Sequence, residues 1–300
     1  MIINLLIPIV AFLLSFILFK PSLAISKSSG AIDYPNTRKM HSKPMARAGG
    51  FSFFVAFSLL LLVSPVDLSF KIPLSLGSIL IFITGFLDDT INLSPFMKLS
   101  GQFLALSVYQ FSRELLGKET PIFQSILISI WLIFITNATN IIDGLDGLAG
   151  GVSASQLICL AVISLFFRNQ DVLICTLLLL GAILGFLPRN FPRAKIFMGD
   201  CGALFLGFVL GCISSELFID NPNLICAISI LLIFRVSLYD AVFSFIRRAL
   251  KGKNPFRADK EHFHHKLVKL GFTKECTTLA LVTLSLTFGL LAVLFVFYSM

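Results

Sequence analysis

Charged residues are scarce in this sequence: Asp, Glu, Lys and Arg make up 13% of its 300 residues, whereas a soluble domain carries about 25%. Apolar residues make up 56%, and the mean hydropathy is +0.92. A chain of this length with so few charged residues cannot cover its surface with polar groups. Most of that surface must therefore face hydrocarbon. The composition excludes a soluble globular protein and indicates an integral membrane protein.

Cysteine patterns that bind metal and signals for leader cleavage are also missing. The six cysteines include no CxxC pair and lie mostly inside apolar runs, so we interpret them as small core residues rather than disulfides. The first apolar stretch has neither a basic leader nor a small-residue cleavage site, and we expect it to remain attached as a helix. Without repeats or low-complexity tracts, residues 1–300 are expected to form a single integral membrane domain.

Ten largely uncharged apolar stretches are candidate transmembrane helices, since a bilayer core about 30 Å thick needs about 20 helical residues. The loops on one side of these stretches hold 19 Lys and Arg residues and those on the other hold four, with Arg235 inside the ninth stretch. The positive-inside rule places the richer loops in the cytoplasm and both termini outside. The predicted fold is all-α, a polytopic membrane helix bundle of about ten transmembrane helices: 2–19, 49–66, 72–87, 99–112, 121–136, 147–167, 172–188, 201–218, 222–246 and 277–297.

Five polar segments fall in the loops that this topology places on the cytoplasmic side. The opposite loops are short and chemically bland. A random scatter of polar residues would not select one face, so we expect the segments to converge on one cytoplasmic cleft. They are residues 33–50, 88–89, 137–151, 190–202 and 259–271.

Carboxylates in these segments point to a hard metal ion. Asp88 and Asp89 end the third apolar stretch, and Asp200 precedes the eighth. Each has a simpler interpretation, as a solvated helix end or an N-cap. With Asp143 and Asp146, however, they place five carboxylates near one membrane face, and their repulsion calls for a hard divalent cation and basic groups. Mg²⁺ suits oxygen ligands and keeps waters and substrate phosphates in its shell.

Amide and carboxyl side chains recur every three residues in the third segment. We expect Asn137, Asn140, Asp143 and Asp146 to point to the same side of a helix or tight turn, while flanking glycines let a ligand approach closely. A capped loop between helices would need only one of these residues. The segment therefore predicts a binding site.

Three of the four histidines in the chain lie within four residues, in its most basic loop. His262, His264 and His265 are candidates for a zinc site, but no cysteine is nearby and the carboxylates elsewhere favour Mg²⁺. We interpret them as hydrogen-bond donors to phosphate, alongside Lys and Arg residues that also suit anionic lipid heads. Carboxylates for a hard cation beside phosphate donors at a membrane surface indicate phosphoryl transfer between a water-soluble nucleotide and a lipid.

The five segments resemble, in order, motifs of the polyprenyl-phosphate N-acetylhexosamine-1-phosphate transferases. The matching stretches are DYPNTRKMH with RAGG, GFLDD, NATNIIDGLDGLAGG, FMGDCGALFLG and HFHHKLVKLG, and they extend over nearly the whole chain. The resemblance implies a bundle of ten or eleven helices in the bacterial inner membrane with a cytoplasmic active site. It also implies transfer of a sugar 1-phosphate from a UDP-sugar to undecaprenyl phosphate with release of UMP, dependent on Mg²⁺ or its substitute Mn²⁺. Enzymes of this family begin O-antigen and other cell-envelope glycans, and no nucleic-acid partner is expected.

The resemblance assigns roles to individual residues. It implies that Asp200 binds Mg²⁺ and that Asp88 and Asp89 are essential. One of that pair would position or deprotonate the lipid phosphate, and a covalent aspartyl intermediate is the alternative route. His264 and His265 would act with them in catalysis. The implied substrate contacts, with the Phe197 ring stacked on uracil, come from Asn140, Asp143, Asp146, Asn190, Phe197 and His262.

The histidine motif separates branches of this family. His-Phe-His-His is similar to the N-acetylglucosamine branch, whereas the muropeptide branch has three consecutive histidines, so phospho-N-acetylmuramoyl-pentapeptide transfer is the alternative. A secondary transporter would carry functional charges at mid-span, where only Arg235 and Asp240 lie. A CDP-alcohol phosphotransferase would need an arginine that DGLDGLAGG lacks. The exact N-acetylhexosamine and a homodimeric state are left open by the sequence.

Overall fold

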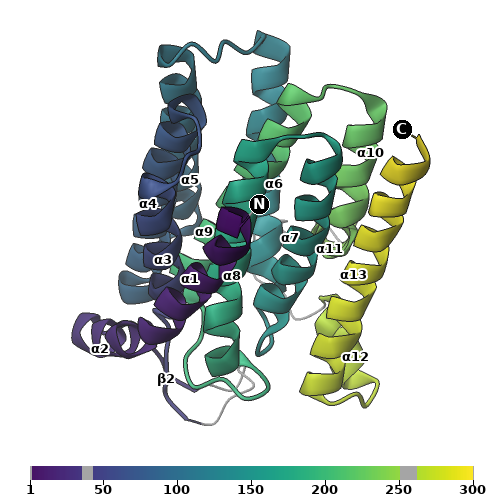
Figure 1. The fold of residues 1–300 in the computed structure, drawn as a ribbon. Helices are drawn as coiled ribbons and strands as arrows, with labels where there is room; N and C mark the ends of the chain where they lie inside the picture. The colour runs from purple at the N-terminus through teal and green to yellow at the C-terminus, as the bar shows by residue number, and fades with distance from the viewer. Residues whose placement is uncertain (1, 36–42, 251–261, 300) are drawn as a thin grey trace.

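Helices account for nearly all of the chain in the computed structural model, which describes residues 2–35, 43–250 and 262–299. Most of them run side by side in one bundle (Figure 1). This confirms the predicted all-α architecture. In chain order the helices are α1 (Ile2–Ile17), α2 (Phe19–Ser29), α3 (Gly50–Val63), α4 (Leu68–Ile91), α5 (Pro95–Leu115), α6 (Ile122–Ile142), α7 (Leu148–Phe166), α8 (Gln170–Asn190), α9 (Gly199–Asp220), α10 (Leu224–Ile233), α11 (Arg235–Leu250), α12 (Phe263–Lys269) and α13 (Lys274–Ser299).

Two short strands lie between α2 and α3 and are not predicted by the sequence. β1 (Ile32–Asp33) and β2 (Met45–Ala46) pair antiparallel, with Ile32 opposite Ala46. Two residues are too few for an alternating pattern of apolar and polar side chains to reveal a strand. The hairpin matters because Arg47 follows β2 directly and is positioned by it.

Within the part of the chain that the structure describes, six helices are long and apolar enough to cross a membrane: α4, α6, α7, α8, α9 and α13. The count rises to eight if each of two bent pairs forms one span, α1 with α2 (42°) and α10 with α11 (74°). Of the other predicted spans, α3 has only 14 residues, and α5 carries the charged residues Lys98, Arg113 and Glu114. The chain is therefore a multi-pass membrane protein. Every predicted stretch is largely helical, and the number of ten complete crossings stays a prediction.

The ninth predicted stretch, residues 222–246, is not one straight span. The chain bends by 74° at Phe234, between α10 and α11. A straight helix would carry Ser237, Asp240 and Ser244 along the membrane normal, whereas in the bent arrangement all three side chains are buried inside the protein. Polar side chains in a membrane protein are costly if they face hydrocarbon, so they need buried partners. The polar face of α11 therefore accounts for the break.

Among the candidate spans, α9 is the most buried, and it lies inside the bundle with α4 and α6 packed against it (Figure 1). Gly207 allows the close approach to α6, because a Cβ at this position would collide with the backbone of Thr136. Asp200 lies in the first turn of α9. The central helix of the fold therefore fixes the position of this carboxylate.

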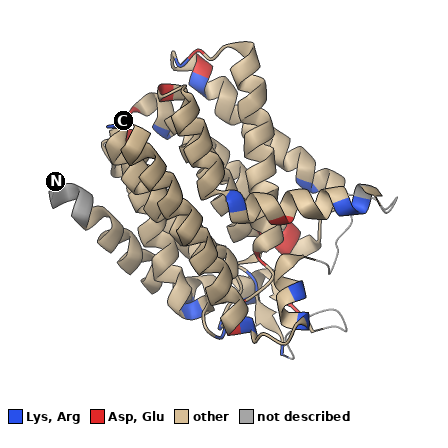
Figure 2. Cartoon of the chain, turned by 90° about the vertical axis from the view of Figure 1, so that its right-hand side faces the viewer, with Lys and Arg blue, Asp and Glu red and all other residues tan. Residues whose placement is uncertain are grey.

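Charged residues lie mainly toward the two ends of the bundle (Figure 2). We use the name hairpin end for the end that contains β1, β2, residues 143–147, residues 191–198 and α12. The opposite end, or far end, comprises residues 64–67, 116–121, 167–169 and 221–223. Contacts near these loops tie the far end together, such as the hydrogen bond from Asn169 Nδ2 to Asp220 Oδ2 at 2.8 Å.

Candidate active site

A cavity of about 660 Å³ lies at the hairpin end. Residues from four of the five polar segments line it. The segment 88–89 does not, but Asn92, in the turn that follows it, does. Parts of the first and last segments, residues 36–42 and 259–261, lie outside the described residues. The predicted site residues that line the cavity are Asn140, Asp143, Asp146, Asn190, Phe197, Asp200 and His265.

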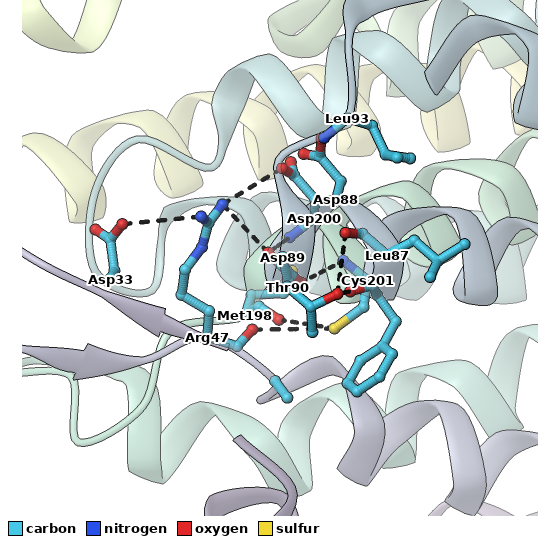
Figure 3. A network of polar contacts seen from close by, with 12 residues as sticks. Asp33, Arg47, Leu87, Asp88, Asp89, Thr90, Leu93, Met198, Asp200 and Cys201 are labelled. Atoms are coloured by element: carbon cyan, nitrogen blue, oxygen red, sulfur yellow. Dashed lines mark hydrogen bonds and ion pairs between the residues drawn. The ribbon is translucent and has the colours of Figure 1, made fainter. Parts of the chain in front are cut away.

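Arg47 lies at the centre of an ion-pair network on one wall of this cavity (Figure 3). Its Nη2 atom is 3.2 Å from Asp89 Oδ1 and 3.4 Å from Asp200 Oδ2, and its Nη1 atom is 3.8 Å from Asp33 Oδ1. Burial by itself would lower the pKa of Arg47, but the carboxylates of Asp89, Asp200 and Asp33 outweigh that effect and raise it. Arg47 is therefore a permanent cation between three acidic side chains.

Lys98, near the start of α5, is the second cation of the site. Its Nζ atom is 2.8 Å from Asp88 Oδ2 and 3.2 Å from Asp200 Oδ2. The sequence offered one signal for it, since Lys98 is the only basic residue in its predicted cytoplasmic loop. Neither Lys98 nor Arg47 was predicted as a site residue, because a basic residue in a cytoplasmic loop is ordinary until its partners are known.

The adjacent carboxylates Asp88 and Asp89 have different surroundings. Asp89 accepts hydrogen bonds from the backbone N–H groups of Asp200 and Cys201, both at 2.9 Å, so it caps the start of α9 from a different helix. Its side chain has no exposed area. Asp88 instead accepts from the Leu93 N–H at 2.9 Å and pairs with Lys98. Asp89 thus positions Asp200, while Asp88 lies beside it.

Glycine is required where the first motif meets the start of α9. Gly199 has a φ of +74°, and a Cβ there would collide with the carbonyl oxygen of Arg47 and with the Asp89 carboxylate. A Cβ on Gly50 would collide with the backbone of Gly202. These glycines let the RAGG and GDCG motifs touch through their backbones, which brings Arg47 to Asp200.

Asn190 and Asp146 join two loops of the cavity wall. The Asn190 side chain accepts from the Gly147 N–H and donates to the Ile196 carbonyl oxygen, both at 2.9 Å. Asp146 Oδ2 accepts from the Ala194 N–H at 3.0 Å. Both residues line the cavity, but these bonds hold residues 143–147 against residues 191–198. Their first role in the structure is therefore to shape the pocket.

Asn137 does not share the side occupied by Asn140, Asp143 and Asp146, and this expectation was wrong. Its amide donates to Gln102 Oε1 on α5 at 2.7 Å, away from the cavity. A helix turns about 100° per residue, so a spacing of three drifts by about 60° at each step. The other three residues line the cavity because α6 ends at Ile142 and the chain turns there.

Asp143 is a carboxyl group whose charge is unfavourable in this setting. Burial, followed by the negative charges of Asp200 and Asp89, raises its pKa to about 7. It therefore holds a proton for part of the time at neutral pH. A group with this pKa can either donate a hydrogen bond or accept one from a ligand in the cavity.

The three histidines occupy different environments. His265 lines the large cavity, whereas His264 is buried against Gly144 and lines a second, mainly apolar cavity of about 260 Å³ between α11, α12 and α13. Burial, followed by the neighbouring His265, lowers the pKa of His264 to about 4, so its ring is neutral at pH 7. His262 lines neither cavity and contacts Asp240 and Ser244 on α11.

Comparison with known proteins identifies the family. Residues 72–217 match the model of glycosyl transferase family 4. The chain is 34% identical to an undecaprenyl-phosphate alpha-N-acetylglucosaminyl 1-phosphate transferase of Thermotoga maritima, over 95% of this chain and 89% of that protein. It is 33% identical to a probable undecaprenyl-phosphate N-acetylglucosaminyl 1-phosphate transferase of Bacillus subtilis, over 88% and 77% of the two chains. A relative in Escherichia coli K12, named like that of Thermotoga, is 30% identical over 89% and 76%. Since these alignments extend along most of both chains, the protein belongs to glycosyl transferase family 4.

Proposed function

We propose that this protein is a phosphotransferase that moves N-acetylglucosamine 1-phosphate, or the 1-phosphate of a closely related N-acetylhexosamine, from a UDP-sugar to undecaprenyl phosphate and releases UMP. The observation that carries the proposal is the single cavity in which Asp200, Arg47, Asp143 and His265 face a common space. The names of the relatives in Thermotoga, Bacillus and Escherichia support the same acceptor and transferred group.

The large cavity is the proposed site of the UDP-sugar. Its volume of about 660 Å³ suits a small polar ligand. Phe197 offers an aromatic face to uracil. Arg47 and Lys274 bring positive charge to the cavity, where it would attract the donor diphosphate. Asp146 and Asn190 keep the walls of the nucleotide pocket together through the backbone bonds described above.

Mg²⁺ fits the carboxylates on this wall. Among residues 2–35, 43–250 and 262–299 there is no group of three or more His, Cys, Asp or Glu side chains that would hold a metal alone. Asp88 and Asp200 nevertheless converge on one cation, the Lys98 ammonium. Mg²⁺ commonly takes one or two protein carboxylates and completes its shell with water and substrate phosphates. Asp200, with Asp88 beside it, would hold Mg²⁺ or Mn²⁺, which would neutralise charge on the leaving UMP.

The acceptor phosphate needs little help from a protein base. A phosphate monoester has a second pKa near 6, so much of it is already a dianion at neutral pH. Asp89 is poorly suited to remove a proton or to form a covalent intermediate, because its buried carboxylate is committed to the N–H groups of α9. We therefore favour direct attack of a lipid phosphate oxygen on the sugar-bearing phosphorus, with UMP as the leaving group and Asp88 and His264 near the acceptor.

The hairpin end is the proposed cytoplasmic face. The loops that reach it belong to the set that holds 19 of the 24 Lys and Arg residues. This orientation puts the cavity on the side where nucleotide sugars are made and, with ten crossings, both termini outside. Cells would then use the protein in the bacterial inner membrane to begin a cell-envelope glycan.

The test is release of UMP by the purified full-length protein with undecaprenyl phosphate. UDP-N-acetylglucosamine, UDP-N-acetylgalactosamine and UDP-N-acetylmuramoyl-pentapeptide are compared as donors, with and without EDTA. We expect an N-acetylhexosamine donor to be used, EDTA to stop turnover and added Mg²⁺ to restore it. Efficient use of the muropeptide donor would move the protein to the other branch. Failure to release UMP from every donor would reject the transferase itself.

A further inference from the structure

Asp240 and Ser244 form a polar face on α11 that none of the roles above explains. They lie one helical turn apart, and both side chains are buried, at 5% and 2% exposure. Buried polar groups in a membrane protein are costly unless they have partners. Their partners lie at the start of α12, the short helix that carries His264 and His265.

The contacts between α11 and α12 are specific. Asp240 Oδ1 accepts a hydrogen bond from the Phe263 N–H at 2.8 Å. Asp240 Oδ2 is 3.3 Å from His262 Nδ1, and the Ser244 hydroxyl is 3.1 Å from the same nitrogen. The Tyr239 ring packs edge-on against the Phe263 ring, with centroids 6.1 Å apart. One face of α11 therefore holds both the His262 side chain and the backbone at the beginning of α12.

α12 needs this support because it is short. It contains seven residues, and His262, which precedes it, makes no side-chain cap of its own. A helix of this length is marginal without tertiary contacts. The Phe263 N–H at the start of α12 has no acceptor within its own helix, and Asp240 accepts its hydrogen bond from a neighbouring helix. Asp89 does the same for an N–H group at the start of α9.

The position of α12 decides where two histidines lie. His264 lines the apolar cavity and His265 the large cavity, although their rings are only 4.4 Å apart. A small rotation or shift of α12 would withdraw one ring from its cavity. On the proposed function, the large cavity holds the UDP-sugar and His264 lies near the acceptor.

We propose that Asp240 and Ser244 are positioning residues for the transfer reaction: by holding His262 and the start of α12, they place His264 and His265 at the two cavities. The inference rests on the proposed function for its catalytic part only. Its structural part, the hold of α11 on α12, concerns the protein without substrate.

The experiment measures hydrogen–deuterium exchange and turnover on the same full-length protein in detergent. Asp240→Ala removes both contacts, Asp240→Asn keeps an acceptor for the Phe263 N–H, and Ser244→Ala removes only the contact with His262. Ser237→Ala is the matched control, because Ser237 lies on the same buried face of α11 but its hydroxyl accepts from Gln156 on α7.

We expect Asp240→Ala to speed exchange in residues 263–270 and to lower kcat about tenfold, the usual scale for losing a residue that orients an active-site group. KM for the UDP-sugar and the thermal unfolding midpoint should change little. Asp240→Asn should lie between Ala and wild type, Ser244→Ala should show a smaller loss, and Ser237→Ala should match wild type.

Two results would overturn the inference. One is unchanged exchange in α12 for both Asp240→Ala and Ser244→Ala, and the other is faster exchange with undiminished kcat. An equal loss in Ser237→Ala would also count against it, because the effect would then belong to α11 packing in general. If wild type releases no UMP, the proposed function fails, and the exchange data still decide whether α11 holds α12.

Discussion

Arg113 and Glu216 at the far end form an enclosed ion pair, whereas Arg47 at the hairpin end is shared by three carboxylates beside a cavity. Arg113 and Glu216 are 2% and 1% exposed, and Arg113 Nη2 is 3.0 Å from Glu216 Oε2. Lys118 is a further partner, with its Nζ atom 2.9 Å from Glu216 Oε1. Acidic and basic side chains are closely balanced there. The ion pair therefore joins α5 to α9 and needs no ligand to neutralise it.

The ion-pair network at the hairpin end has more acidic than basic members. Arg47 and Lys98 face Asp33, Asp88, Asp89 and Asp200, and Asp143 is close enough to Asp200 and Asp89 for their charges to raise its pKa. An excess of negative charge in this network, beside an open cavity, favours the binding of a cation. Balanced buried charge therefore indicates structure, and unbalanced charge at a cavity indicates a site.

The sharpest contrast between the ends should be their accessibility. In a Cys276→Ser background, which removes the only exposed thiol among the described residues, single cysteines replace Asn92 or Arg193 at the hairpin end and Glu119 at the far end. We expect an impermeant maleimide to label the first two only from the cytoplasm and the third only from outside. Labelling of Asn92→Cys from outside would place the cavity on the wrong face for a nucleotide sugar.

Removing charge from the hairpin end should abolish chemistry and leave the fold intact. Asp200→Asn keeps the side-chain volume but loses a hard anionic ligand, and we expect UMP release to fall by a factor on the order of 10²–10³. The measurement is turnover across a Mg²⁺ titration, with the unfolding midpoint as the check on folding. Near-normal turnover at ordinary Mg²⁺ would remove Asp200 from the metal site.

Removing charge from the far end should destabilise the fold and leave the chemistry intact. Glu216→Gln leaves Arg113 without its buried partner, and breaking such a pair costs about 3–5 kcal/mol in the free energy of unfolding. We expect a much lower unfolding midpoint and near-normal UMP release per folded molecule at low temperature. The double variant Arg113→Met/Glu216→Leu should recover most of the stability. A loss of turnover in that stable double variant would show that the far end also serves catalysis.

The smallest effect should be the pH dependence that Asp143 adds to stability. Its pKa is about 7 in the folded protein and 3.8 ordinarily, so between about pH 4 and pH 7 the folded state holds a proton that the unfolded chain has lost. The free energy of unfolding therefore falls as the pH rises through this window. Asp143→Asn has no carboxyl group to ionise, so its unfolding midpoint should exceed that of wild type at pH 8 and match it at pH 4. An equal difference at both pH values would contradict the raised pKa.

The sequence predicted the elements of this fold better than their partners. Apolar stretches identified the helices because hydrocarbon demands long runs of one kind of residue. The bend at Phe234 was missed, since the polar residues of α11 are few and their buried partners lie elsewhere in the chain. The hairpin was missed because each of its strands has only two residues.

Roles within the candidate site were harder to predict than its membership. Asp88 and Asp89 are the same residue type at adjacent positions, and only the three-dimensional arrangement shows that Asp89 turns toward α9 and Asp88 toward Lys98. His262, His264 and His265 likewise form one motif in the sequence, yet α12 directs them to three surroundings. Spacing along the chain predicts that residues meet, but the direction of each side chain depends on helix rotation.

The backbone contact between Gly50 and Gly202 has a consequence for engineering donor specificity. Since no side chain separates α3 from α9 at this contact, the wall of the cavity that carries Arg47 and Asp200 cannot be remodelled by small side-chain adjustments. Other lining residues, such as Ala194 and His265, belong to a loop and a short helix. Mutant libraries that aim to change the accepted sugar should vary the loop that carries Ala194 and leave the wall with Arg47 and Asp200 untouched.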